Sequence, residues 1–410
     1  MLLIEVILCD VVSLRERSKY LGIVLSMAAL GAIVGPPLGG VIAERNWRWN
    51  FFLNLPVAGL IFVLMGVSMR PQHKKPVNRR SALVQIDWIG IIIFIGSTGS
   101  ILLGIVLGSS NFPWRSPNVI TPLVIGPIGW VCFYFYESSS YCTNPAVPVH
   151  LFRNRTSVAG YAITFIFSTF TTWFAFCWPT YFQAVLGMSP LKAGLGYLVY
   201  SGFLIPSAIA SGFLVTKTGI YRPIQMAGFL ILALGSGLNI MLDSNAKLAV
   251  RIILIALNAI GLGCVIPSVL PAILASLPEP DVAKATGMYS FFRSFGYIWG
   301  ATLPAIIFNS SFSRFSFQIS DRKIREMMEN GDAYQYVSGA FLGSLPPLVK
   351  VEVIDVYSKS LRVAWEVAIA FAVVGMLLVA IEKHVVLRTE LDTEYGVDSP
   401  SKENEDEHSA

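Results

Sequence analysis

The sequence predicts an all-α protein that crosses a membrane many times. Hydrophobic residues make up 54% of the chain and charged residues only 13%, whereas average soluble domains carry about 25% charged residues. The mean hydropathy is +0.63. Apolar segments long enough to cross a bilayer, which requires roughly 20 residues, recur along the chain. These observations exclude a soluble domain and predict a polytopic helical membrane protein.

Ten such segments follow one another, after a shorter apolar stretch at 2–12. One of them alone could be a buried helix of a soluble protein, but ten in series indicate membrane spans. The stretch at 2–12 is not a signal peptide, because it lacks a basic start and contains Glu5 and Asp10. We expect helices at about 20–43, 51–69, 88–107, 118–137, 157–182, 191–215, 223–243, 249–277, 287–309 and 361–383.

Basic residues in the connecting loops predict the orientation. Among the short loops, those on the side of 13–19 and 70–86 hold thirteen Lys and Arg residues, and those on the opposite side hold six. Because cytoplasmic loops carry the excess of positive charge, the first side is predicted to be cytoplasmic. The acidic tail 386–410 falls on that side and is expected to be disordered. The long loop 310–360 is expected outside, as one or two short helices that form a solvated cap rather than a ligand lid.

The first full segment carries an unusual pattern of glycine and proline. Gly31, Gly35 and Gly39 recur every four residues and share one helical face, where a neighbouring helix can approach closely. Pro36 and Pro37 disrupt helical hydrogen bonding within the same segment. A kinked, tightly packed helix suits a gate between moving halves, and simple helix packing is the alternative.

This segment also resembles a family motif. The pattern Gly31-x-x-x-Gly35-Pro36-x-x-Gly39-Gly40 resembles the antiporter motif of span 5 in drug exporters of the major facilitator superfamily. The continuation Trp47-Arg48-Trp49-x-Phe51-x-x-Asn54-x-Pro56 is similar to the fourteen-span drug:proton antiporter branch, especially its fungal members. The resemblance implies two six-helix halves around a midplane site. It also implies proton-driven efflux of amphipathic drugs or secondary metabolites.

The resemblance assigns the ten segments to family spans 5 to 14. The runs 151–155, 181–187, 212–219 and 293–300 resemble further family positions, and Asp10 and Arg17 match the loop that follows span 4. We therefore expect an N-terminal remnant at 1–69, a linker with two extra spans at 70–150, a complete C-terminal six-helix half at 151–385 and the tail. Spans 1 to 3 and most of span 4 would be absent. Because rocking needs both halves, we expect transport to require a helper chain or an oligomer.

Catalytic and cofactor motifs are not visible in this sequence. The four histidines lie in loops, the tail or span ends, and the five cysteines lack metal-ligand spacing. The net charge of +5 is spread over loops and does not suggest nucleic acid. We expect no enzyme, cofactor or metal. The expected partners are the bilayer, a small-molecule substrate and protons.

Ionisable residues within spans are functional candidates. Arg293 is the best one, because Tyr289 and Tyr297 flank it at spacing four on the same face, although it could instead snorkel to lipid headgroups. Phe170, Trp173 and Phe174 share a helical face and could form an aromatic wall for planar substrates. Lipid-facing aromatic residues are the alternative for this group.

Several polar residues at or near the spans have simpler interpretations. Asn258 is the buried amide of its segment and could contact substrate or bond across helices. Asn54 is expected to hold the outer loop together with Trp47, Arg48 and Trp49. Asp87 at a span entrance is expected to cap a helix.

Two other functions remain open. A related branch would transport siderophores or other organic solutes, and a truncated relic or subunit would not transport at all. An integral membrane enzyme is disfavoured because no catalytic constellation is visible. We expect the plasma membrane, with a vacuolar or vesicle membrane as the alternative.

Overall fold

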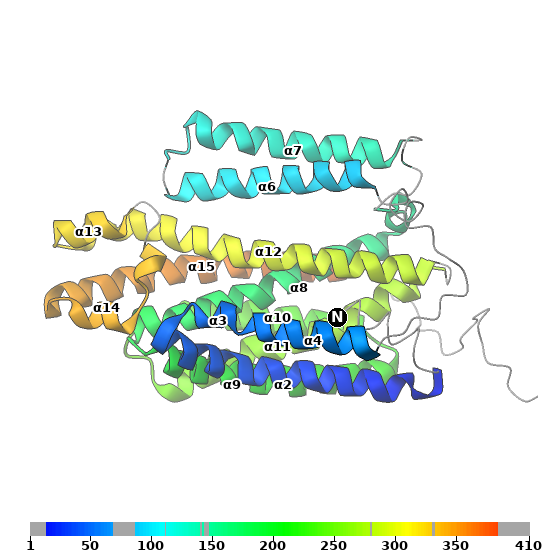
Figure 1. Cartoon of the computed structure of the whole chain (residues 1–410), viewed down its shortest axis with the longest axis horizontal. Helices are drawn as coiled ribbons and strands as arrows, with labels where there is room; N and C mark the ends of the chain where they lie inside the picture. Colours follow the sequence, from blue (N-terminus) through cyan, green and yellow to red (C-terminus); the bar gives the residue numbers. More distant parts are fainter. Residues whose placement is uncertain are drawn as a thin grey trace, which may run out of the picture.

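The computed structural model describes residues 14–68, 87–110, 112–139, 142, 147–278, 281–329 and 333–383. All regular elements among these residues are helical, and the long helices run side by side (Figure 1). The loop residue Asp10 and the tail 386–410 lie outside the described residues, and only the backbone is described at Arg17.

Each of the ten predicted segments is a helix, with the segment 51–69 divided between α3 and α4. The long helices are α2 (Leu14–Asn46), α4 (Asn54–Ser68), α6 (Trp88–Ser110), α7 (Pro117–Glu137), α8 (Arg155–Thr180), α9 (Pro190–Thr218), α10 (Arg222–Asn239), α11 (Leu248–Ala275), α12 (Val282–Phe315) and α15 (Pro347–Ile381). The short elements are α3 (Trp49–Phe52), η1 (Val149–Phe152), the π-helix η2 (Tyr181–Val185), η4 (Ser316–Gln318), α13 (Arg322–Met328), η5 (Ala333–Tyr336) and α14 (Gly339–Ser344).

Seven helical stretches among the described residues are long and apolar enough to cross a membrane. They are 49–67, 88–108, 117–137, 155–185, 190–218, 248–275 and 347–381. The helices α10 and α12 are not among them because they carry more polar residues. In α10 these residues turn inward, since Gln225, Ser236 and Asn239 are buried within the bundle. The periodicity of burial, rather than hydropathy alone, explains how such a helix fits between its neighbours.

The outer segment 310–360 differs from its prediction. Two short helices, α13 and α14, are present as expected, but α12 continues to Phe315 and α15 already begins at Pro347. The residues from Val349 to the end of the expected loop are therefore the first part of the last long helix. Its apolar face stays in register with the buried face of the following span, so nothing interrupts the helix. At 1.5 Å per residue, α15 is about 52 Å long, well beyond the roughly 30 Å of a bilayer core.

The helices α8 to α12 and α15 form one packed bundle with a continuous aromatic core. Trp173, Trp178 and Trp365 are among its largest fully buried side chains. Small residues allow close helix contacts, since a Cβ at Gly300 of α12 would collide with the Thr169 carbonyl oxygen of α8. This is the close approach that small residues permit between membrane helices.

Two smaller groups of helices pack against this bundle. The helix α2 packs along α9 and is followed by α3 and α4, and the antiparallel pair α6 and α7 lies along α12 (Figure 1). None of the apolar window 49–67 is buried. We attribute this exposure to the surrounding bilayer, which favours apolar side chains at helix surfaces.

Candidate functional site

The contact between α2 and α9 uses a different part of the motif from the one predicted. A Cβ at Gly40 would lie 2.7 Å from the Pro190 carbonyl oxygen, and a Cβ at Gly194 would collide with the Pro36 carbonyl. No described atom lies within 4 Å of a Cβ placed on Gly31 or Gly35. The expected groove for a neighbouring helix is therefore unfilled at those two glycines.

The rest of the glycine and proline motif lies in the second half of α2. The helix runs through Pro36 and Pro37 without interruption. The remaining glycine of the predicted face, Gly39, has the Asn50 amide oxygen 3.9 Å from its Cβ position. At the outer end, Glu44 accepts a hydrogen bond of 3.1 Å from the Leu191 backbone N–H in the first turn of α9. This bond satisfies a donor that the helix itself leaves unpaired.

The outer turn after α2 has the structural role that the sequence indicated. The Asn54 amide donates to the Asn50 carbonyl at 3.3 Å, and the Asn50 amide donates to the Gly39 carbonyl at 3.4 Å. The Arg48 guanidinium lies 5.2 Å from the centre of the Trp47 ring. Trp49 packs edge-on against Phe52, with ring centres 6.0 Å apart. These contacts connect the turn to the glycine-rich helix.

Arg293 lies on α12 beside the two tyrosines that the spacing indicated. Its guanidinium carbon is 5.5 Å from the centre of the Tyr289 ring, a cation–π arrangement. Tyr289 is buried, whereas Tyr297 is 37% exposed one helical turn beyond Arg293. The Tyr297 carbonyl accepts a 3.0 Å hydrogen bond from the Thr172 hydroxyl of α8. This face of α12 thus combines a partly buried cation with an accessible aromatic ring.

The aromatic group on α8 lies deeper than a substrate wall requires. Phe170, Trp173 and Phe174 are each at most 1% exposed. Trp173 packs against Phe371 of α15 at 5.7 Å, and Phe174 packs against Tyr200 of α9 at 5.9 Å. In this structure the three side chains hold helices together, and they would reach a substrate only if α8 moved away from α15.

Asn258 lies at the contact between α10 and α11. Its side chain is fully buried, and its amide oxygen is 2.6 Å from the Cβ position of Gly235 on α10. Neither side-chain polar atom has a hydrogen-bond partner in the structure. Asn258 therefore lies at a helix–helix contact within the bundle and not on a surface that a substrate could reach.

A buried carboxylate at the C-terminal end of α15 was not singled out from the sequence. Glu382 follows the last residue of α15 and is 1% exposed, and neither carboxylate oxygen has a hydrogen-bond partner. Burial raises its pKa to about 8, an effect that the Arg222 cation partly offsets. In the sequence, Glu382 stands next to Lys383 and resembles an ordinary solvated residue after a helix, so only the packing reveals its burial.

Hydrogen bonds close the bundle around Glu382. Arg222 of α10 donates to the carbonyls of Val379 and Ala380, at 3.1 and 2.7 Å, and so caps the end of α15. The Lys383 backbone N–H donates to the Thr156 hydroxyl at 3.2 Å. On α8, the N-cap Asn154 accepts from the Thr156 N–H and donates to the Ser276 carbonyl. The helices α8, α10, α11 and α15 therefore meet in one polar end-structure.

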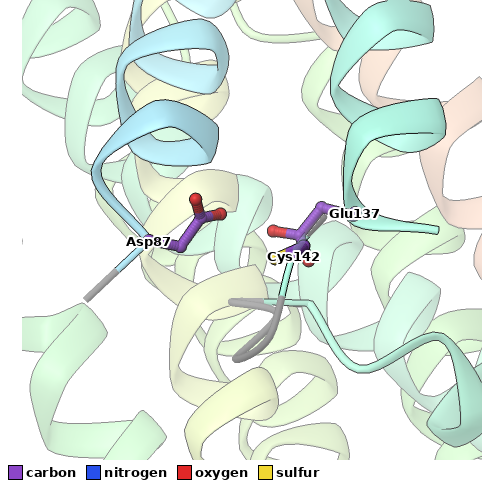
Figure 2. Close-up of side chains that lie close together, drawn as sticks. All are labelled: Asp87, Glu137 and Cys142. Carbon is purple, nitrogen blue, oxygen red and sulfur yellow. The ribbon is translucent and has the colours of Figure 1, made fainter. Parts of the chain in front are cut away.

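A group of two acids and a cysteine lies where α6 begins and α7 ends. Figure 2 shows Asp87, Glu137 and Cys142, whose potential ligand atoms all lie within 4.8 Å of one another. Asp87 accepts a 2.9 Å bond from the Gly90 N–H, which confirms the predicted helix cap. Glu137 accepts from the Val147 N–H at 3.3 Å. These backbone bonds give two of the three groups a structural role without a metal ion.

Comparison with known proteins agrees with this architecture. The family model described as Major Facilitator Superfamily matches residues 1–301. The chain belongs to the major facilitator superfamily. Its all-α, multi-pass membrane fold is an incomplete form of the superfamily fold, as predicted from the sequence.

Curated relatives of the chain are fungal transporters. The MFS efflux transporter aclA of Aspergillus oryzae is 42% identical over 399 residues, which cover 97% of this chain and 72% of that protein. The MFS-type transporter gkaD of Penicillium citrinum is 40% identical, over 99% of this chain and 70% of its own length. The efflux pump FUS6 of Gibberella fujikuroi is 37% identical, over 98% and 73%.

Proposed function

We propose that this chain exports amphipathic drugs or secondary metabolites in exchange for protons. The observation that carries the proposal is the close contact between α2 and α9, where Gly40 and Gly194 admit backbone of the other helix. A close, smooth contact lets the N-terminal helices slide or rock against the C-terminal bundle with little side-chain rearrangement. The efflux names of the relatives support this direction of transport.

We assign direct substrate contact to the exposed face of α12. Arg293 would attract acidic or electron-rich groups, and Tyr297 would stack on planar apolar ones. Phe170, Trp173 and Phe174 would contact the substrate only in a second state, in which α8 has separated from α15. Asn258 is proposed to serve the contact between α10 and α11 in both states.

Proton exchange is proposed from the family resemblance and from one buried acid. Glu382 has a pKa raised to about 8 by burial, so its charge changes within the range of cytoplasmic pH. A carboxylate of this kind can bind and release the proton that crosses the membrane in the direction opposite to the substrate. The plasma membrane is the proposed location, and a fluorescent tag would distinguish it from a vacuolar or vesicle membrane.

Efflux of a fluorescent planar drug from cells that express this chain alone tests the proposal. We expect that copies of this chain form an oligomer that carries out efflux, which a protonophore abolishes and which Arg293→Ala reduces at least tenfold. Arg314→Ala is the matched control, because Arg314 is an exposed arginine at the outer end of the same helix. Protein levels and membrane insertion are measured in parallel.

Two results would reject the proposal. If Arg293→Ala left efflux unchanged, the assignment of substrate contact to this face of α12 would be wrong. No efflux despite normal insertion would mean that the chain needs a helper chain, or that it is a non-transporting relic. Uptake of siderophores or other organic solutes in the same cells would support the related transport branch instead.

A further inference from the structure

A cavity lies between the pair α6–α7 and α12, away from the contact of α2 with α9. It encloses about 550 Å³, within the range of pockets that hold small ligands. Figure 1 shows α6 and α7 as a separate layer beside α12. The lining includes Ile91 and Phe94 of α6, Phe133 of α7, and Lys284, Gly287 and Phe291 of α12.

The floor of this cavity is a fixed aromatic cluster. The Phe94 ring centre is 5.3 Å from that of Phe133 and 5.2 Å from that of Phe291. Phe291 in turn stacks on Phe295 at 6.0 Å. One wall is open, since no atom lies within 4 Å of a Cβ placed on Gly287. The cavity therefore offers a preformed apolar slot for a flexible chain.

Charge at one end of the slot indicates an anionic ligand. Lys284 lines the cavity and is exposed in the first turn of α12. Two acids on adjoining segments are already engaged, because Asp281 bonds His150 at 3.0 Å and Glu137 accepts from the Val147 backbone. Among the residues that the structure describes, Lys284 forms no ion pair, so its ammonium group is available to a phosphate.

The position in the bilayer identifies the source of that ligand. Lys284 lies at the end of α12 that the loop charges place in the cytoplasm, level with the start of α6 at Trp88. Ile92, next to the lining residue Ile91, is 68% exposed, and Ile95, which also lines the cavity, is 64% exposed. Because these apolar side chains face lipid, an acyl chain can enter the slot from the bilayer.

We propose that this cavity binds an anionic phospholipid of the cytoplasmic leaflet. One acyl chain lies over the phenylalanine floor beside Gly287, and the phosphate lies at the Lys284 ammonium. Basic pockets between membrane helices on the cytoplasmic side suit such headgroups. The bound lipid fills the gap between α12 and the pair α6–α7 and so stabilises their contact.

Native mass spectrometry of the purified full chain tests this assignment. Delipidated protein is titrated with palmitoyl-oleoyl phosphatidylserine and, separately, with the corresponding phosphatidylcholine. We expect one preferred phosphatidylserine per chain. Lys284→Gln should weaken phosphatidylserine about fivefold, the contribution of one lysine near a lipid surface. It should weaken phosphatidylcholine less, because the choline cation offsets the charge of its phosphate. Gly287→Leu should weaken both lipids at least tenfold by filling the slot.

Matched controls separate this site from general lipid attraction. Lys217→Gln removes an exposed lysine at the cytoplasmic end of α9, and Gly66→Leu adds the same side chain in open space on α4. Both should bind like the wild type. Equal phosphatidylserine affinity in all five proteins would overturn the proposal, as would full competition by glycerophosphoserine, which has the headgroup without acyl chains. If Gly287→Leu does not fold, the comparison of Lys284→Gln with Lys217→Gln decides the outcome.

Discussion

Replacing Glu382 by glutamine should change how stability depends on pH. In the folded protein, burial raises the pKa of this acid from 4.5 to about 8, although Arg222 lies close enough to lower it somewhat. The folded state therefore binds the proton more tightly than the unfolded chain. The stability from this group is fully present below pH 4.5 and is lost as the pH rises through 8. By linkage the loss at pH 8 is about 4 kcal/mol.

Thermal unfolding in detergent between pH 5 and pH 9 measures this effect. Because glutamine stays neutral, the Tm of Glu382→Gln should match the wild type near pH 5 and exceed it increasingly toward pH 9. Glu366→Gln is the control, since Glu366 is an exposed acid on the same helix. A Tm difference between Glu382→Gln and wild type that stays constant over this range would refute the buried, protonated state.

The remaining predictions concern packing and helix ends. Gly194→Leu should lower the Tm and abolish any efflux because it separates α9 from α2, whereas Gly202→Leu, in open space on α9, should have little effect; thermal unfolding and drug efflux measure both. Asn154→Ala removes an N-cap and should cost about 1 kcal/mol, measured as a lower midpoint in a denaturant titration. Trp365→Ala should cost about 3–5 kcal/mol because the ring is 1% exposed in the core, and a strongly reduced yield of monodisperse protein would show it.

Local sequence signals predicted the helices well. Segment 88–107 became α6 and segment 118–137 became α7, because long apolar runs between turn residues admit only helix in a bilayer. Asp87 and Asn54 also adopted their expected local bonds. These roles depend on neighbours within a few residues, which the sequence shows directly.

Roles that depend on distant segments were predicted less well. The spacing of Gly31 and Gly35 indicated a close helix contact, but the actual contact uses Gly40 with Gly194, more than 150 residues apart in the chain. Periodicity identifies a shared face without saying which neighbour covers it. Similarly, the aromatic spacing of Phe170 and Phe174 is compatible with a cavity or a core, and only the presence of Tyr200 and Trp365 shows that they are buried.

The sequence by itself determined the class, the family and the succession of helices, because the bilayer requires apolar helices and the motifs are local strings. The tertiary structure alone decided which groups are isolated from water. Glu382 and Lys284 look alike in the sequence as charged residues at helix ends, yet one is buried and the other is exposed beside an apolar cavity. The free energy of a charge depends on the atoms around it, and those atoms come from helices far away in the chain.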